Sequence, residues 1–168
     1  YFKYMPYMPW DIAPQFENSS MMIKANYIAD CFVVGSDQVW NDKLYKYFGE
    51  FGYLNYIFDN RVKVSYATSF GTQRWNGTLE EKDLVGYYLK KFDAVSVRET
   101  SGVDICKTYF NVNAEWVLDP ILMLDKNVYD VLGEKSTIDI PNRFVFAYIL
   151  DESIEKLRIA KEIATKLD

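Results

Sequence analysis

Histidine is absent from the whole sequence of 168 residues. Because histidine is the commonest general base and the commonest metal ligand in proteins, both roles must fall to other side chains here. The sequence also lacks a Cys-x-x-Cys pair, a P-loop and a carboxylate-rich calcium loop. Any catalysis within this chain must use carboxylates, Arg, Lys, Tyr or backbone groups, or be completed by residues outside it.

Cysteine and long apolar runs are also scarce. The two cysteines, Cys31 and Cys106, lie far apart on expected regular elements. This placement predicts two small buried thiols in a reducing compartment rather than a disulfide. No apolar run approaches the length of a membrane span, and no signal peptide opens the sequence. We therefore expect a cytoplasmic protein that does not span a membrane.

Positive charge is in deficit, with 19 Lys and Arg against 24 Asp and Glu and a net charge of −5. A broad contact with nucleic acid or anionic lipid is therefore not expected. An anionic small molecule is still compatible, because one or two arginines in a cleft override the mean charge. Hydrophobic residues make up 49% of the chain, a composition typical of a folded protein.

Short apolar runs alternate with amphipathic stretches along the chain. We expect strands at 29–35, 61–67, 94–97, 114–118 and 143–150, and helices at 78–92, 99–109 and 151–167. Thr78 and Glu81 form a capping box at the start of the first of these helices. Residues 1–14, with three prolines, are expected to be irregular and to lie over a surface groove. The alternation predicts an α/β fold with a parallel sheet and flanking helices.

The last strand and helix follow a stretch that resembles a linker. We expect one lobe over residues 1–125, a linker over 126–142, and the first strand and helix of a second lobe over 143–168. The helix at 151–167 is expected to turn Ile154, Leu157, Ala160, Ala164 and Leu167 inward. On this interpretation the chain is a fragment of a longer protein.

Small polar and charged residues follow four of the expected strands. In open α/β sheets ligands bind outside the carboxyl ends of the strands, so these residues are expected to share one rim. They are Gly35, Ser36, Asp37 and Gln38 after the first strand, Ser69 and Gly71 after the second, Arg98 and Glu99 after the third, and Asp119 after the fourth.

The first two strand ends allow a structural and a functional interpretation. Asp37 either caps the following helical turn or orients a substrate hydroxyl or a cationic partner. Ser69 and Gly71 fit both a plain turn and a backbone that approaches a ligand closely. Trp40 is interpreted as a packing anchor in preference to a platform for a stacked ring.

The third and fourth strand ends are equally open to two interpretations. The planar fork of Arg98 suits a carboxylate or a phosphate, and its position at the start of a helix suits an anion. The same arginine fits an internal bridge to Glu99 or to an aspartate. Asp119, followed by Pro120, fits a rigid strand exit as well as a functional role.

Taken together, four segments resemble the polysaccharide pyruvyl transferase family in their order and spacing. They are VGSDQVWN (34–41), SYATSFG (65–71), FDAVSVRE (92–99) and VLDP (117–120). The resemblance spans roughly residues 27–124. It implies a Rossmann-like lobe within a two-lobed architecture like that of glycosyltransferases, with the active site between the lobes.

The resemblance also implies an activity. Family members transfer a pyruvyl group from phosphoenolpyruvate onto sugar hydroxyls of bacterial cell-surface or extracellular polysaccharides, commonly as a ketal. The implied partners are phosphoenolpyruvate as donor substrate and a glycan or lipid-linked sugar as acceptor, with no cofactor and no metal. A homo-oligomer is compatible with this picture.

Two departures from the family pattern bear on the activity of this chain. The strand and glycine-containing turn with which members normally begin are absent, and the family's proposed histidine and a further arginine belong to the second lobe, beyond Asp168. We therefore expect the full-length protein to be the enzyme and this chain alone to be inactive.

Site roles follow from the resemblance and from the chemistry of the side chains. The expected catalytic residues are Asp37, Arg98 and Glu99, with Arg98 contacting the donor anion while the two carboxylates orient the acceptor or hold Arg98. The acid is expected in the second lobe. Two alternatives are a nucleotide-sugar glycosyltransferase and a non-catalytic glycan-binding homologue. The expected substrate-binding residues are Gly35, Ser36, Gln38, Ser69, Gly71 and Asp119.

Overall fold

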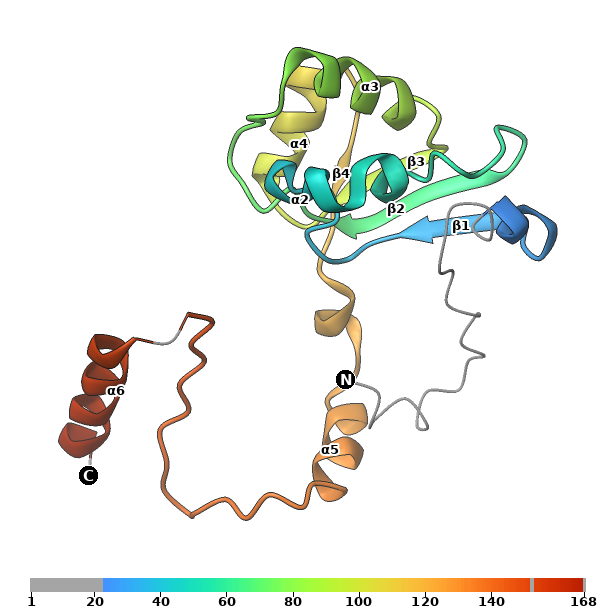
Figure 1. Cartoon of the computed structure of the whole chain (residues 1–168). Helices are drawn as coiled ribbons and strands as arrows, with labels where there is room; N and C mark the ends of the chain where they lie inside the picture. The colour runs from blue at the N-terminus through green and yellow to red at the C-terminus, as the bar shows by residue number, and fades with distance from the viewer. Residues whose placement is uncertain (1–22, 152, 168) are drawn as a thin grey trace. The chain divides into compact units, whose positions relative to one another are not determined.

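The computed structural model describes residues 23–151 and 153–167, and the chain divides into two compact units. The first unit ends at Leu124 and the second begins at Asp125 (Figure 1). The irregular segment expected over residues 1–14 lies outside the described residues. The sheet and the candidate site belong entirely to the first unit.

The first unit is built on a four-stranded parallel sheet. Its strands pair in the order β1-β2-β3-β4, and every pairing is parallel, which confirms the α/β fold with a parallel sheet. All four lie at the positions expected from the sequence. Their bounds are β1 (Cys31–Val34), β2 (Val62–Thr68), β3 (Ala94–Val97) and β4 (Glu115–Trp116).

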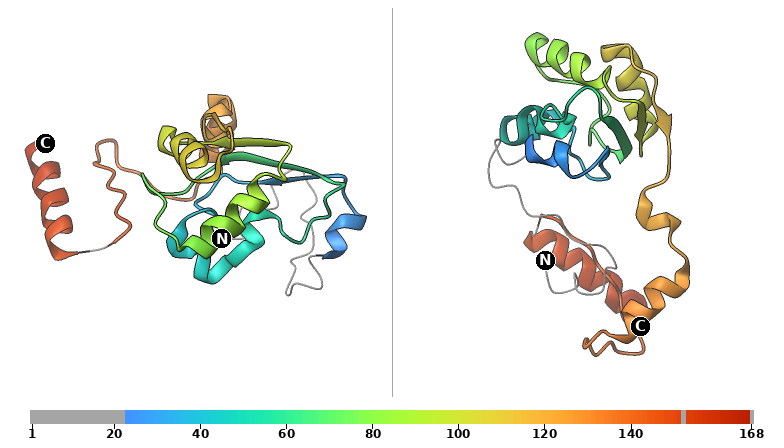
Figure 2. Two further views of the ribbon diagram at one scale, coloured as in Figure 1. Left: turned by 90° about the horizontal axis from the view of Figure 1, so that it is seen from above. Right: turned by 90° about the vertical axis from the view of Figure 1, so that its right-hand side faces the viewer.

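Helices connect these strands and pack on one face of the sheet (Figures 1 and 2). The alternation along β1 agrees with this arrangement, since Phe32 and Val34 pack into the core while Val33 is exposed. The expected helix at 99–109 consists of α4 and a π-helical turn. The connecting elements are η2 (Ile23–Tyr27), α2 (Asp42–Phe48), η3 (Gly49–Tyr53), α3 (Leu79–Leu89), α4 (Thr100–Ile105), η4 (Cys106–Phe110) and η5 (Pro120–Met123).

Helix α3 begins as the sequence predicts. Thr78 accepts a hydrogen bond from the backbone N–H of Glu81 at 3.2 Å, and the Glu81 carboxylate accepts one from the N–H of Thr78 at 2.7 Å. Val85 and Leu89 are fully buried on its inner face. The capping box therefore fixes where α3 begins, and the apolar side chains decide which face meets the core.

Two buried serines complete the backbone bonding where the register between β2 and β3 shifts. The irregularity lies between Ser65 and Thr68. The hydroxyl of Ser96 donates to the carbonyl of Ser65 at 2.8 Å and accepts from the N–H of Ala67 at 3.2 Å. The hydroxyl of Ser65 donates to the carbonyl of Ser96 at 3.1 Å and accepts from its N–H at 2.9 Å. The hydroxyl groups of Ser65 and Ser96 therefore replace backbone hydrogen bonds between β2 and β3 where the register shifts.

Ser96→Ala is expected to lower the free energy of unfolding by about 1–3 kcal/mol, because it leaves the buried N–H of Ala67 without its acceptor. Urea titration measures the change. Ser101→Ala is the matched control, since the Ser101 hydroxyl makes one long 3.4 Å contact to the carbonyl of Thr72. Equal effects of the two substitutions would contradict the bridging role of Ser96.

The two cysteines differ in exposure, and the expectation of two buried thiols is wrong for Cys31. Cys106 is fully buried, and burial raises the pKa of its thiol to about 12. Cys31 is exposed, because it lies at the start of β1 with its side chain directed away from the packed residues of that strand. A short apolar run does not reveal which of its alternate residues faces the core.

A thiol reagent is therefore expected to modify one cysteine in the native protein and two after unfolding. Mass spectrometry of the labelled protein identifies the site, which should be Cys31. Rapid native labelling of Cys106 would contradict the packing of α4 and η4 against the sheet.

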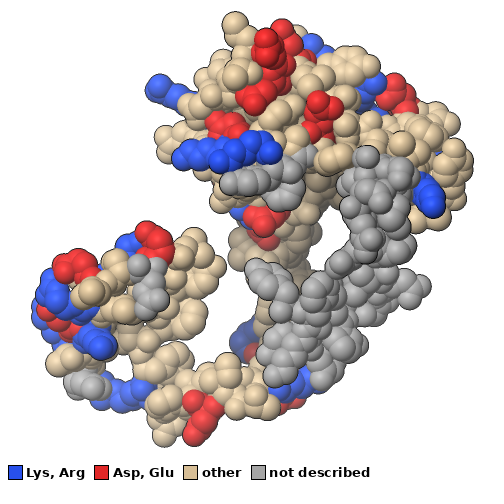
Figure 3. All heavy atoms as spheres, viewed as in Figure 1, with Lys and Arg blue, Asp and Glu red and all other residues tan. Residues whose placement is uncertain are grey.

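Among its described residues, the second unit holds two helices, α5 (Lys126–Glu134) and α6 (Ile154–Leu167). Helix α5 lies within the stretch expected to be a linker. Arg158 on α6 pairs with Glu155 and Glu162, so acidic and basic side chains lie together on its surface (Figure 3). The division of this part of the chain into a linker and a second lobe stays a prediction.

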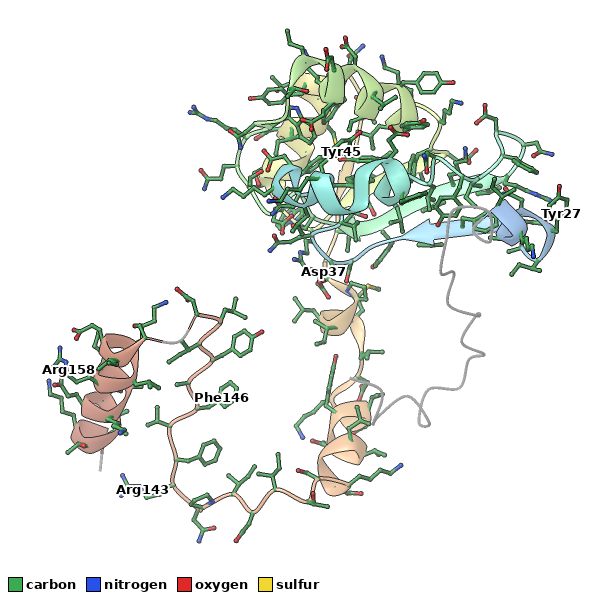
Figure 4. All side chains as sticks on the ribbon, viewed as in Figure 1. Tyr27, Asp37, Tyr45, Arg143, Phe146 and Arg158 are labelled. Carbon is green, nitrogen blue, oxygen red and sulfur yellow. The ribbon has the colours of Figure 1, made fainter. Side chains whose placement is uncertain are left out.

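The strand expected over residues 143–150 does not form. These residues are described and are extended, but no described segment pairs with them, and Phe144, Phe146 and Tyr148 remain exposed (Figure 4). The helix is present at α6, yet its apolar face is not buried, and Ile154 is 89% exposed. A strand requires a neighbouring strand to complete its backbone hydrogen bonds. An apolar sequence pattern indicates that a segment can pair in this way, but it does not show whether a neighbour is present.

Among the described residues, no helix is both long enough and apolar enough to cross a membrane. Within residues 23–151 and 153–167, no three Cys, Asp or Glu side chains converge on a point that would hold a metal ion.

Candidate functional site

The loop after β1 turns immediately against β2. Gly35 has φ of +141°, and a Cβ at this position would lie 2.0 Å from the carbonyl oxygen of Tyr66. Only glycine permits this approach. The hydroxyl of Thr68 donates to the carbonyl of Val34 at 3.0 Å, so the ends of β1 and β2 are held together. Gly35 therefore has a steric role, which brings the polar loop beside the end of β2.

Two backbone hydrogen bonds fasten this loop to the end of β2. The N–H of Trp40 donates to the carbonyl of Ser69, and the N–H of Ser69 donates to the carbonyl of Asp37, both at 3.2 Å. Gly71 follows with φ of +65°, and a Cβ there would lie 2.2 Å from Oε1 of Gln38. Gln38 thus packs against the Gly71 backbone and forms part of the loop's own structure.

Asp37 is exposed, and of the two roles left open for it the structure does not show the helix cap. Its carboxylate accepts the N–H of its neighbour Gln38 at 2.7 Å, at the carboxyl end of β1 (Figure 4). The cap of α2 is Asn41, whose Oδ1 accepts the N–H of Lys43 at 2.9 Å. Asn41 also donates to Oε1 of Gln38 at 2.8 Å. The Asp37 side chain is consequently directed by a local turn and remains accessible to solvent.

Trp40 is a packing anchor, as the sequence predicts. It is fully buried, its ring stacks on Tyr53 at a centroid distance of 5.6 Å, and it contacts Phe70 at 5.4 Å. The indole N–H donates to the carbonyl of Gly52 at 2.8 Å. The loop between β1 and α2 is therefore held from below by an aromatic core.

A connected set of side chains links all four strand ends. We refer to Ser36, Ser69, Arg98, Glu99 and Asp119 as the strand-end cluster. Arg98 lies at its centre, with Nε donating to Oε1 of Glu99 at 3.0 Å and Nη1 donating to Oδ2 of Asp119 at 2.9 Å. The hydroxyl of Ser69 donates to the same Oε1 of Glu99 at 2.8 Å, and Ser36 lies close enough to Asp119 to help lower the pKa of that carboxyl.

Three hydrogen bonds between side chains and the backbone fix the positions of the cluster residues. The N–H of Gly71 donates to the hydroxyl of Ser69 at 2.9 Å, and the N–H of Ile121 donates to Oδ1 of Asp119 at 3.1 Å. The indole of Trp116 donates to the carbonyl of Arg98 at 3.1 Å. Trp116 was not predicted as part of the site, although its place in the fourth strand beside the third would have indicated it.

The charges of the cluster stabilise one another. Burial opposes the charged form of Arg98, but its hydrogen bonds to Asp119 and Glu99 outweigh that effect and raise its pKa. The pKa of Asp119 is lowered, first by the N–H of Ile121 and then by Arg98. Arg98 and Asp119 are therefore ionised at neutral pH, and the guanidinium is shared between two carboxylates.

The structure brings the predicted residues together at one edge of the sheet. Arg98 forms the internal bridge that the sequence left open as one alternative, while part of its side chain remains exposed, at 26%. Gly35, Gln38 and Gly71 shape the loops around the cluster, and Asp37 lies on the same loop as Ser36. Their expected roles in catalysis and substrate binding remain predictions.

The arrangement can serve two chemical purposes. Arg98 can bind a carboxylate or phosphate through the donors that its two internal partners do not use. The exposed carboxylates can accept hydrogen bonds from hydroxyl groups, because an ionised carboxylate has about four lone-pair positions and each one here uses only some of them. An anion and a hydroxylated ligand are thus both suited to this edge.

A separate hollow of about 550 Å³ lies over the sheet. It is lined by side chains of β2, β3 and β4, including Val64, Ala94 and Glu115, and by Lys90 and Asp93 from the preceding turn. None of the nine predicted site residues lines it. The hollow therefore does not bear on the strand-end cluster.

Comparison with known proteins concerns the chain as a whole. The model of the polysaccharide pyruvyl transferase family matches residues 2–168. No curated protein and no solved structure matches this chain. The matched range includes all four sequence segments on which the resemblance was based, and that resemblance is confirmed.

Proposed function

This chain belongs to the polysaccharide pyruvyl transferase family, and we propose that its strand-end cluster contributes to a site that moves a pyruvyl group from phosphoenolpyruvate to a sugar hydroxyl. The family description supports pyruvyl transfer to polysaccharide in general. One observation supports the more specific proposal. Arg98 lies among the four strand ends, bonded to Glu99 and Asp119, where open α/β sheets bind their ligands.

Phosphoenolpyruvate carries a carboxylate and a phosphate. A protein that binds it needs cationic donors with fixed directions, and the planar guanidinium of Arg98 provides them. Glu99 and Asp119 fix the plane of that guanidinium through Nε and Nη1. We assign the donor contact to Arg98 for this reason.

The proposed reaction proceeds through protonation of the donor. A proton adds to the methylene carbon, positive charge develops at the neighbouring carbon, and the oxygen of a sugar hydroxyl bonds to that carbon as its proton passes to a base. The bond from this carbon to the phosphate oxygen then breaks and inorganic phosphate leaves. A second sugar hydroxyl bonds to the same carbon in place of the phosphate, its proton passes to the departing phosphate, and the ketal is complete. An acid and a base are required, and we place the acid in a second lobe.

The acceptor is bound by carboxylates in this proposal. Asp37 is exposed on the loop after β1, and the Glu99 side chain is 39% exposed beside Arg98. Both can accept hydrogen bonds from sugar hydroxyls and orient them toward the donor. The protein would act in the cytoplasm on a glycan or lipid-linked sugar, without a cofactor.

Thermal denaturation of the full-length protein with phosphoenolpyruvate and with a panel of nucleotide sugars tests the donor. A ligand that binds only the folded state raises the melting temperature. We expect a rise with phosphoenolpyruvate and none with nucleotide sugars. A rise with a nucleotide sugar alone would indicate a glycosyltransferase and would contradict the proposed donor.

A further inference from the structure

Arg98 is held by two carboxylates, and the two contacts differ in kind. Glu99 engages Nε, on the side of the guanidinium that faces the arginine's own backbone. Asp119 engages Nη1, at the outer end of the group. Because Nε is engaged by Glu99, the outer edge formed by Nη1 and Nη2 is the edge left to present two parallel N–H groups to an anion.

Glu99 is fixed independently of any ligand. Its Oε1 accepts both Nε of Arg98 at 3.0 Å and the hydroxyl of Ser69 at 2.8 Å. Ser69 is itself fixed by the N–H of Gly71 at 2.9 Å. Because Glu99 also follows Arg98 directly in the chain, this contact orients the guanidinium without covering its outer edge.

Asp119 remains well bonded even without Arg98. The N–H of Ile121 donates to its Oδ1 at 3.1 Å, and the Ser36 side chain lies beside it. Arg98 reaches only Oδ2, through Nη1. Loss of that contact would therefore not leave the carboxylate without partners, whereas it would expose the outer edge of the guanidinium.

We propose that Asp119 and the anionic group of the donor compete for the outer edge of Arg98, so that Asp119 sets donor affinity by exchange rather than by contact with the donor. On binding, the donor anion bonds to Nη1 and Nη2, Asp119 gives up Nη1, and Glu99 keeps Nε. No covalent bond changes in this step. The inference rests on the proposed function for the identity of the anion.

The two carboxylates then have opposite effects on anion binding. Asp119→Asn replaces the charged competitor by a weaker neutral acceptor and removes a negative charge close to the anion, so the dissociation constant for phosphoenolpyruvate is expected to fall about tenfold. Glu99→Gln removes the charge that orients Arg98, and the dissociation constant is expected to rise. A purely structural role for both residues would weaken binding in both variants.

Calorimetric titration of the full-length protein with phosphoenolpyruvate, and separately with inorganic phosphate, measures these affinities. Asp119→Ser is the control for folding, because a serine oxygen can still accept the N–H of Ile121 while the charge is removed. It should bind the anion more tightly, as Asp119→Asn does. Melting temperatures of all variants establish that the fold is retained.

Weaker or unchanged binding by both Asp119 variants, with binding by the parent protein intact, would overturn the exchange and leave the proposed function standing. If the parent protein binds neither phosphoenolpyruvate nor inorganic phosphate, the proposed function fails and the exchange fails with it. Tighter binding of inorganic phosphate alone by Asp119→Asn would support the exchange and reject the donor.

Discussion

Arg98→Lys is expected to lower the turnover of the full-length protein roughly 100-fold while the fold is retained. Lysine keeps the positive charge but lacks the planar fork, so it cannot keep the bond that Nε makes to Glu99 and also direct two parallel N–H groups at an anion. Steady-state rates with phosphoenolpyruvate, together with its dissociation constant, measure the effect. The loss should appear in both quantities, because Arg98 contacts the donor before and during the reaction.

The matched control for this substitution is Arg158→Lys on α6. Arg158 pairs with Glu155 and Glu162 on an exposed helix surface, and such pairs add little to stability. Rates should not change in this variant. Normal turnover and donor affinity in Arg98→Lys would restrict Arg98 to an internal bridge and remove the anion contact from the proposal.

Trp40→Ala is expected to lower the free energy of unfolding by about 3–5 kcal/mol. The side chain is fully buried, stacks on Tyr53 and contacts Phe70. Its removal leaves a cavity beneath the loop that carries Asp37, and the carbonyl of Gly52 loses its donor. Urea denaturation of the chain, followed by circular dichroism, measures the change.

Tyr27→Ala provides the comparison at an exposed aromatic residue, since Tyr27 is 75% exposed and meets Phe58 edge-on (Figure 4). Its effect should stay within about 0.5 kcal/mol. A loss of less than about 1 kcal/mol for Trp40→Ala would fall below the usual range for a buried tryptophan and contradict its role as an anchor.

Elements with local signals could be predicted from the sequence. The capping box of Thr78 and Glu81 marks the start of α3, and Asp119 followed by Pro120 marks the end of the fourth strand region. Parallel order followed from the alternation of strands and helices. The meeting of Ser69, Arg98 and Asp119 at one edge then follows from the geometry of a parallel sheet.

Features that depend on a second partner in space could not be predicted. The sequence could not show whether Arg98 bonds to Glu99, to Asp119 or to both, because all three arrangements fit the same spacing. Nor could it show that Asn41 rather than Asp37 caps α2, since both residue types are good caps. The strand expected at 143–150 is wrong for a related reason, since pairing requires a neighbouring strand.

The same reasoning applies to burial. Cys31 belongs to an apolar run, and only the packing of Phe32 and Val34 shows which alternate residues face the core. The helix α6 was predicted correctly, whereas the burial of its apolar face was predicted wrongly. Amphipathic periodicity shows that a helix has an apolar face, but it does not show which surface, if any, covers that face.

The most direct test of the central claim is transfer itself. The full-length protein is incubated with isotopically labelled phosphoenolpyruvate and a panel of glycosides that carry neighbouring hydroxyl groups, and the products are examined by NMR and assayed for phosphate. The account predicts a labelled ketal carbon on a sugar and release of inorganic phosphate that depends on that acceptor, both lost in Arg98→Lys. Sugar transfer from a nucleotide sugar, with no acceptor-dependent release of phosphate from phosphoenolpyruvate, would contradict it.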